Sequence, residues 1–359
     1  MPIRVLLLDD SAICRTQLRE ILEADERIEV VAEAHNGDQV LRLIDEATPH
    51  ILLVDLQMPG TGGQETIERV MAHQPLPILI VTGQPEGVRR QAVFEAIRRG
   101  ALDLAEKPLH GDGEAEERLR AMVRELSRVR VVRHVAGKLN RRDGAPGLPT
   151  PVPPRPLDGS NSPLVVGVAA SAGGPRPLVS LLSGWPADFA AAIAVVQHLP
   201  NGFTTAFAEF LQSRVPQRVT IVRQLVRFEP GHVYLATDDQ HLVALSDKQL
   251  GVDHGAPLEG HRPAATVLFE SLAARLGARS CGVILSGMGR DGVAGLLKMK
   301  ARGALTLSQE EAGCAVYGMP KAALEAGASV AALDPVGLAR EVTTWVSLQP
   351  SNLPRAPGR

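Results

Sequence analysis

The chain has 359 residues, and at roughly 150 residues per domain this length predicts two domains and a connection. Hydrophobic residues make up 45% and charged residues 22%, the balance of a globular rather than a disordered protein. The net charge of -2 argues against a nucleic-acid binder. Three isolated cysteines favour a reducing compartment, and no apolar run reaches the ~18–20 residues of a membrane span. We therefore expect a cytoplasmic protein with no membrane insertion.

Short apolar runs alternate with helical patterns over the first third of the chain. Continuous apolar runs are typical of buried parallel strands, and repeated strand–helix alternation predicts a doubly wound sheet with its ligand crevice at the carboxyl ends of the strands. The predicted strands are 3–8, 30–35, 50–56, 77–83 and 101–108, and the predicted helices are 11–22, 38–46, 63–73, 87–99 and 113–136.

Polar residues stand at the carboxyl ends of four of these strands. Asp9 and Asp10 end the first strand, Asp55 the third, Thr82 the fourth and Lys107 the fifth. Carboxylates held together repel one another unless a cation is present, and oxygen ligands suit Mg²⁺. A carboxylate, a divalent cation, a hydroxyl and an ammonium are what an acyl phosphate needs. Taken singly, these residues could instead cap a helix, occupy a turn or carry solvated charge.

Three motifs in this segment resemble the response-regulator receiver domain: VLLLDDSAICR, ILLVDLQMPGTGG and DLAEKP. The resemblance covers roughly residues 3–125. It implies that Asp55 is the phosphoacceptor and that a histidine kinase supplies the phosphoryl group. It also implies that Thr82 and Lys107 read out the phosphate.

The same resemblance implies a Mg²⁺ site in this domain. Asp9, Asp10 and Asp55 would hold the ion together with the backbone carbonyl of Gln57. Many receivers carry an aromatic switch residue three positions before the lysine, where this chain has Leu104. We therefore expect a weak rotamer switch and an unaltered phosphorylation site.

A proline-rich connection separates the two halves of the chain. Residues 137–163 contain seven prolines and show no hydrophobic periodicity, which predicts a semi-extended spacer, although its PVPP fragment could dock on a Pro-binding module. The expected layout is a first domain at 1–125, a helix end and linker at 126–162, a second domain at 163–349 and a flexible tail at 350–359.

The strand–helix alternation resumes in the second half and predicts a second doubly wound α/β domain. The expected strands are 164–171, 191–199, 219–225, 280–288 and 304–308, with a hairpin-like stretch at 231–247. We expect one helix to begin at Pro175 and another after residue 199. Further helices are expected at 263–276, 292–302 and 320–326, and a last helix is expected to end near Leu348.

A serine in the segment GVAASAGGP has the surroundings of a nucleophile. Ser171 follows a strand and precedes a helix, whose free N–H groups suit an oxyanion. A serine needs a base, and His198 ends the next strand, while Asp291 ends another and could orient the imidazole. Each has a simpler role as well: Ser171 or Asp291 could be only a helix cap, and His198 an ordinary strand-end histidine.

A dinucleotide-binding loop is a rival interpretation of the same region. Residues 287–292 read G-x-G-x-x-G between a strand and a helix, and Glu310 and Glu311 follow at about the spacing of a ribose-binding acid. On spacing alone, a nicotinamide-dependent oxidoreductase remains open. A metal hydrolase is less favoured, since no His or carboxylate pair in this half has the helical spacing of metal ligands.

The second half resembles the catalytic domain of the chemotaxis protein-glutamate methylesterases, the CheB family. The resemblance rests on motifs in one order: GVAASAGGP, VVQHLP, PGHVYLATDDQHL, HRPAATVLFESLA, SGMGRDG and AVYGMPKAAL. It implies Ser171 as the nucleophile, His198 as the base and Asp291 as the residue that orients it. The Met288 backbone N–H would help to form the oxyanion hole, and Ala172 replaces a threonine that many members carry.

The resemblance implies a phosphorylation-regulated serine esterase. Its substrates would be glutamate methyl esters on the cytoplasmic domains of methylated chemoreceptors, with methanol released, receptor glutamines as possible further substrates and no cofactor in the catalytic domain. Phosphorylation of Asp55 would release the receiver from the catalytic face. Arg262 and Arg290 could contact an acidic substrate. A response regulator whose output domain only binds a partner is the remaining alternative.

Overall fold

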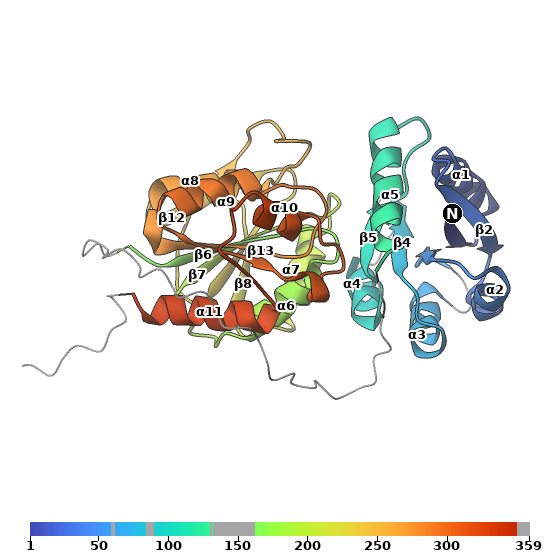
Figure 1. Cartoon of the computed structure of the whole chain (residues 1–359), viewed down its shortest axis with the longest axis horizontal. Helices are drawn as coiled ribbons and strands as arrows, with labels where there is room; N and C mark the ends of the chain where they lie inside the picture. Colours follow the sequence, from blue (N-terminus) through green and yellow to red (C-terminus); the bar gives the residue numbers. More distant parts are fainter. Residues whose placement is uncertain (59–61, 84–89, 130, 132–161, 350–359) are drawn as a thin grey trace, which may run out of the picture.

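The computed structural model describes residues 1–58, 62–83, 90–129, 131 and 162–349. They form two α/β domains that lie side by side (Figure 1). The proline-rich stretch and the tail at 350–359 fall almost entirely outside the described residues, so the predictions made for them stay predictions. Within the described parts, no helix combines the length and apolar character needed to span a membrane.

The first domain is built on five parallel strands in the order β2-β1-β3-β4-β5. The strands that lie inside the sheet are buried on both faces, which explains their continuous apolar sequence. The strands are β1 (Ile3–Leu8), β2 (Ile28–Ala34), β3 (Ile51–Val54), β4 (Ile78–Thr82) and β5 (Asp103–Glu106). The helices are α1 (Ala12–Glu23), α2 (Val40–Ala47), α3 (Gly63–His73), α4 (Arg90–Arg99) and α5 (Gly113–Leu126), with a 3-10 turn η1 (Gly37–Gln39) before α2.

The last helix of this domain is shorter than predicted. The sequence suggested 113–136, but α5 ends at Leu126. Its buried stripe also ends there, because Leu119, Val123 and Leu126 are the residues that face the sheet. Ser127 closes the helix, since its hydroxyl donates to the carbonyl of Arg124 at 3.1 Å.

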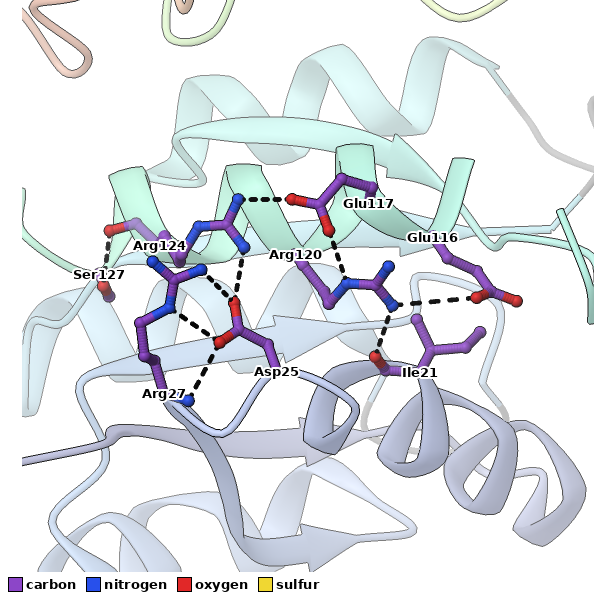
Figure 2. A network of polar contacts seen from close by, with 8 residues as sticks. All are labelled: Ile21, Asp25, Arg27, Glu116, Glu117, Arg120, Arg124 and Ser127. Carbon is purple, nitrogen blue, oxygen red and sulfur yellow. Dashed lines mark hydrogen bonds and ion pairs between the residues drawn. The ribbon is translucent and has the colours of Figure 1, made fainter. Parts of the chain in front are cut away.

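A network of polar contacts fixes α5 to the end of α1 (Figure 2). Arg124 bridges Asp25 and Glu117, at 2.7 Å to each carboxylate. Arg120 donates to the carbonyl of Ile21 at 3.0 Å. Single exposed ion pairs contribute little to stability, but contacts shared between two helices define how α5 lies on its own domain. This matters because α5 also faces the second domain (Figure 1).

The second domain contains a sheet of seven parallel strands in the order β15-β14-β13-β6-β7-β10-β8. The predicted doubly wound fold is therefore confirmed in both domains. The strands are β6 (Val165–Ala170), β7 (Ala192–Gln197), β8 (Arg218–Val222), β10 (His232–Ala236), β13 (Ser280–Ile284), β14 (Leu305–Gln309) and β15 (Ala331–Leu333). The helices are α6 (Pro175–Ser183), α7 (Thr204–Gln212), α8 (Ala265–Arg275), α9 (Val293–Ala301), α10 (Met319–Glu325) and α11 (Pro335–Ser347), with 3-10 turns η2 (Gly277–Arg279) and η3 (Glu311–Gly313).

The hairpin expected at 231–247 is wrong. Its first half, β10, joins the large sheet in parallel between β7 and β8. Its second half is β11 (His241–Ala244), which pairs antiparallel with β12 (Gln249–Asp253) in a separate sheet completed by β9 (Val226–Arg227). The sequence of two short strands separated by a turn is the same as that of a hairpin. The two strands nevertheless pair with different partners and not with each other.

The domains contact each other through α4 of the first and α7 of the second. Phe94 of α4 is 1% exposed, and its ring centroid lies 5.4 Å from that of Phe207 and 5.3 Å from that of Phe210. Beside this aromatic cluster, Arg214 forms an ion pair with Glu95 at 3.1 Å. The contact is therefore an apolar centre with a polar edge, as in other specific interfaces.

Candidate active site

Both sheets place their chemistry at the point where the strand order reverses. In the first sheet this point lies between β1 and β3, and in the second between β13 and β6. Loops leaving neighbouring strands there diverge to opposite faces and open a crevice at the carboxyl ends. Asp9 and Asp55 follow β1 and β3, and Ser171 and Asp291 follow β6 and β13.

Ser171 lies in a tight turn between β6 and α6. Its N–H donates to the carbonyl of Ser286 at 3.0 Å, and its own carbonyl accepts from the N–H of Gly174 at 2.9 Å. Gly173 has a φ of 70°, a conformation that favours glycine. The N-cap of α6 is Gly174. Ser171 therefore does not have the alternative role of a helix cap.

His198 comes from the strand next to Ser171. Its N–H donates to the carbonyl of Ala170 at 3.0 Å, so the two residues follow the ends of adjacent strands, which are about 4.8 Å apart. The side-chain amide of Gln197 donates to the carbonyls of both Ser171 and His198, at 2.8 and 3.0 Å. The predicted serine and histidine are thus neighbours at one edge of the sheet.

The predicted carboxylate reaches the same histidine. Asp291 Oδ2 lies 2.9 Å from His198 Nε2, and Asp291 is 4% exposed. Its two oxygens also accept from the backbone N–H groups of Ala265 and Thr266, at 2.6 and 2.9 Å, in the first turn of α8. The carboxylate does not cap α9, whose N-cap is Gly292. It binds to the positive end of another helix, a favourable place for an anion.

This arrangement keeps Asp291 ionised. Burial by itself works to raise the pKa of the carboxyl, but the hydrogen bonds with His198, Thr266 and Ala265 outweigh it and hold the pKa well below its usual range. An ionised Asp291 accepts the proton on Nε2 and leaves Nδ1 as the basic nitrogen. His198 Nδ1 is buried and, like the hydroxyl of Ser171, has no hydrogen-bond partner among the residues that the structure describes.

The loop 287–292 lies directly against the serine. A Cβ on Gly287 would come within 2.9 Å of the Cβ of Ser171, so this glycine allows the close approach. The N–H of Met288 meets no acceptor among the described residues and is free to bind an oxyanion. The glycine-rich pattern therefore has a packing role here. Asp291, inside the loop, would also repel a pyrophosphate, which argues against the dinucleotide interpretation.

A second histidine, which no pattern in the sequence singles out, completes this edge. The ring of His261 stacks on that of His198 with centroids 4.1 Å apart and planes 10° apart. Burial, followed by the neighbouring His198, lowers the pKa of His261 to about 4. The residue lies in the HRPAATVLFESLA motif, but neither helical nor strand spacing relates it to His198.

The two predicted substrate-contacting arginines differ in their surroundings. The guanidinium of Arg262 is engaged by Asp239 at 2.7 Å and donates to the carbonyl of Gly255 at 3.0 Å. These contacts hold the loop that carries His261, and contact of Arg262 with a substrate stays a prediction. Arg290 is exposed, and its contact with a substrate stays a prediction.

The edge of the first domain gathers the predicted phosphorylation residues. Ligand oxygens of Asp9, Asp10 and Asp55 lie within 4.8 Å of one another and could hold a metal ion. One oxygen of Asp55 accepts from the N–H of Gln57 at 2.9 Å. The other oxygen pairs with Lys107 Nζ at 2.5 Å, and a carboxylate oxygen of Asp9 pairs with the same ammonium at 2.7 Å.

Lys107 is strongly held by these carboxylates. Burial alone would lower the pKa of Lys107, but its contacts with Asp55 and Asp9 raise it above its usual value. Thr82 is fully buried, and its hydroxyl lacks a hydrogen-bond partner within the described part of the chain. An unpaired buried hydroxyl beside this cluster is available to an added phosphoryl group.

The first domain covers the serine turn of the second. Ala172 and Val316 share a buried apolar cluster with Leu102 and Ala105 at β5. The carboxyl of the adjacent Asp103 accepts a hydrogen bond from the backbone N–H of Gly173, and burial raises its pKa to about 7. The residue that follows the nucleophile position is thus enclosed by the other domain.

Comparison with known proteins agrees with this architecture. Residues 166–342 match the family model of the CheB methylesterase, and residues 5–123 match that of the response regulator receiver domain. A protein-glutamate methylesterase/protein-glutamine glutaminase 2 of Anaeromyxobacter dehalogenans (strain 2CP-C) is 40% identical over 91% of this chain and 92% of its own length. The chain belongs to this methylesterase/glutaminase family.

A further relative and a solved structure are also similar to this chain. Protein-glutamate methylesterase/protein-glutamine glutaminase 4 of Myxococcus xanthus (strain DK1622) is 38% identical and covers 89% of this chain and 90% of its own. The crystal structure of the Thermotoga maritima CheB methylesterase catalytic domain is 32% identical, with a TM-score of 0.49, over 51% of this chain and 98% of that one. The resemblance drawn from the motifs is confirmed, and the first domain is a receiver domain.

Proposed function

We propose that the chain hydrolyses glutamate methyl esters on methylated chemoreceptors and that phosphorylation of Asp55 regulates this activity. The observation that carries the proposal is the His198–Asp291 hydrogen bond, at 2.9 Å, directly beside the turn of Ser171. Family membership supports the reaction class, and the names of the relatives extend it to protein glutamines.

In the proposed reaction, Ser171 Oγ attacks the ester carbonyl while its proton passes to His198 Nδ1. The ionised Asp291 holds the ring in the required tautomer and stabilises the imidazolium. His198 then gives the proton to the leaving methoxide, and methanol departs from a glutamyl-serine ester. Water, deprotonated by His198, cleaves that ester and restores Ser171. For a glutamine side chain, ammonia takes the place of methanol.

The tetrahedral intermediate carries a negative charge that the site must bind. The free N–H of Met288 is the donor that supports this role, since it lies in the loop packed against Ser171. Ala172 follows the serine and has no hydroxyl, so we assign stabilisation of the charge to backbone groups alone.

Regulation is proposed to act by uncovering the site. The receiver domain packs on the serine turn through β5 and the contact with Gly173, and this would keep a receptor from the half-buried Ser171. Phosphorylation would shift the balance between docked and released receiver domains. Lys107 and Thr82 are the residues proposed to bind the phosphoryl group and to change the α4–β5 side that contacts the catalytic domain.

A divalent cation fits the acidic end of the receiver sheet. Asp9, Asp10, Asp55 and the carbonyl of Gln57 would hold Mg²⁺, which when bound neutralises charge on the incoming phosphoryl group. The proposed phosphodonor is a histidine kinase and the proposed substrate is the cytoplasmic part of a chemoreceptor, so the reaction is assigned to the cytoplasm.

The decisive experiment measures methanol release from membranes that contain methylated receptors, with and without a small-molecule phosphodonor. We expect release by the wild type to rise with the phosphodonor, Ser171→Ala to release none, and Asp55→Ala to release the same small amount under both conditions. No release by the wild type under either condition would refute the esterase. Unchanged release by Ser171→Ala would refute the assigned nucleophile.

A further inference from the structure

The hydrogen bond to Asp291 does not by itself fix the imidazole of His198. It holds one nitrogen, Nε2, at 2.9 Å from the carboxylate, but the ring can still swing about that bond. Proton transfer requires Nδ1 to stay within hydrogen-bond reach of the serine hydroxyl and in the correct plane. Nδ1 itself has no partner among the described residues that could hold it. A second restraint is therefore needed.

His261 supplies a restraint of the right kind. Its ring lies nearly parallel to that of His198, with an angle of 10° and a centroid distance of 4.1 Å. A stacked ring blocks rotation out of the plane, which is the motion that the Asp291 bond leaves open. The two contacts are complementary, since one fixes an atom and the other fixes a plane.

The loop that carries His261 is itself held firmly. His261 and Leu258 exchange two backbone hydrogen bonds, at 3.0 and 3.1 Å, across a turn in which Glu259 and Gly260 both have positive φ. The buried His241 bonds both sides of the loop: its Nδ1 accepts from the N–H of Ala264 at 3.1 Å, and its Nε2 pairs with the carbonyl of residue 256 at 3.0 Å.

The charges around His261 suit this role. The groups that act on it electrostatically are His198, Asp291 and, from α5 of the receiver domain, Arg118. Burial and the first of these keep it neutral near pH 7. A neutral ring can cover His198 without opposing the positive charge that the imidazole gains when it takes the serine proton.

We propose that His261 is a positioning residue for the esterase reaction, which holds the plane of the His198 imidazole by stacking on it. The proposal rests on the assignment of Ser171 and His198 made above. His261 acts through His198 and takes no proton itself, so any flat ring of similar size should replace it.

The test compares His261→Ala, which removes the ring, with His261→Phe, which keeps a flat ring. Methanol release is measured at saturating phosphodonor over a range of receptor concentrations, so that kcat and KM are separated. Labelling of Ser171 by a fluorophosphonate probe is timed in parallel, because its rate depends on activation of the serine and needs no receptor. His232→Ala is the matched control, since His232 also stacks on a ring, that of Tyr234. His232 lies at the amino end of β10, whereas the active site lies at the carboxyl ends of the strands.

We expect His261→Ala to lower both kcat and the labelling rate by about 10- to 100-fold, with KM within about twofold. His261→Phe should restore both to within about threefold of wild type, and His232→Ala should change neither. A raised KM with unchanged kcat and labelling would overturn the proposal in favour of a substrate contact. Failure of His261→Phe to recover activity while keeping the wild-type Tm would also overturn it. Ser171→Ala, run alongside, separates these outcomes from failure of the nucleophile assignment.

Discussion

The two sheet edges of this protein hold carboxylates in opposite ways. In the receiver domain, Asp9 and Asp55 lie close together and share Lys107, with the exposed Asp10 beside them. In the catalytic domain, a single buried Asp291 is bonded by one histidine and two backbone N–H groups. The receiver carboxylates keep a net negative charge that a bound cation or phosphoryl group can change. The carboxylate of Asp291 already has hydrogen-bond partners for both of its oxygens.

This difference indicates which sheet edge is regulatory and which is catalytic. A site that is satisfied before substrate arrives needs no rearrangement to act, because its dipoles already point where charge develops. Such a site can be regulated by covering it, and the receiver domain lies over the serine turn. The receiver edge, by contrast, must change when phosphorylated, so its unbalanced carboxylates suit it.

The largest effect should separate the two edges by a single change in each. Asp291→Asn removes the charge that orients His198 and should lower kcat by about 10³- to 10⁴-fold. Asp55→Asn makes the same chemical change in the receiver domain and should leave the activity without phosphodonor within about twofold of wild type. Both are measured as methanol release from methylated receptor membranes.

A matched control tests whether any carboxylate on a helix end would do the same. Asp334 caps α11 by accepting from the N–H of Gly337 at 2.7 Å, far along the chain from the site. Asp334→Asn should keep full activity, since asparagine is also a good cap. If Asp291→Asn lost no more activity than Asp334→Asn, the assignment of Asp291 as the residue that orients His198 would be wrong.

An intermediate effect should follow from loosening the cover. Phe94→Ala removes the ring that packs against Phe207 and Phe210, and loss of a buried aromatic side chain weakens such a contact strongly. We expect the activity without phosphodonor to rise by at least about tenfold, toward the stimulated level. The measurement is methanol release with and without phosphodonor.

Phe94→Leu provides the graded comparison, because leucine retains much of the apolar contact and should give a smaller rise. A melting curve on each variant distinguishes a released receiver domain from an unfolded one. If both variants folded normally and neither raised the basal activity, covering by this face would not be what restrains the enzyme.

The smallest effect concerns pH and tests whether docking of the receiver domain on the catalytic domain depends on protonation of Asp103. Burial at the domain contact raises the pKa of Asp103 to about 7, with hydrogen bonds from Leu104 and Gly173 as smaller opposing effects, while a solvated aspartate has a pKa of about 3.9. Because the docked value is the higher one, the protonated carboxyl favours docking. Its contribution is complete below the solvated value and is lost as pH rises through about 7.

From pH 6 to pH 8 the docking equilibrium should therefore weaken roughly tenfold. Asp103→Asn imitates the protonated form at every pH and keeps an acceptor for the N–H of Gly173. The ratio of wild-type to Asp103→Asn activity, without phosphodonor, cancels the pH dependence of the catalytic residues themselves. That ratio should climb across this range, and a constant ratio would show that Asp103 does not control the cover.

Much of the fold follows from local sequence. The buried strands stand out as continuous apolar runs, and α3, predicted at 63–73, spans Gly63–His73. The errors arose where local pattern could not decide. The stretch 231–247 contains two strands that pair with different sheets, and α5 stops where its apolar stripe leaves the sheet, although its charged pattern continues.

Apolar runs and short motifs were enough to predict the two sheets, the family and the residues that follow each strand, because strand ends at a reversal of strand order meet whatever the loops do. The contacts of those residues depend on the three-dimensional packing. Asp291 rests on the N–H groups of α8, which begins 26 residues earlier, and His261 stacks on a ring 63 positions before it. Backbone groups and ring planes leave no spacing in the sequence, so these contacts could be found only in space.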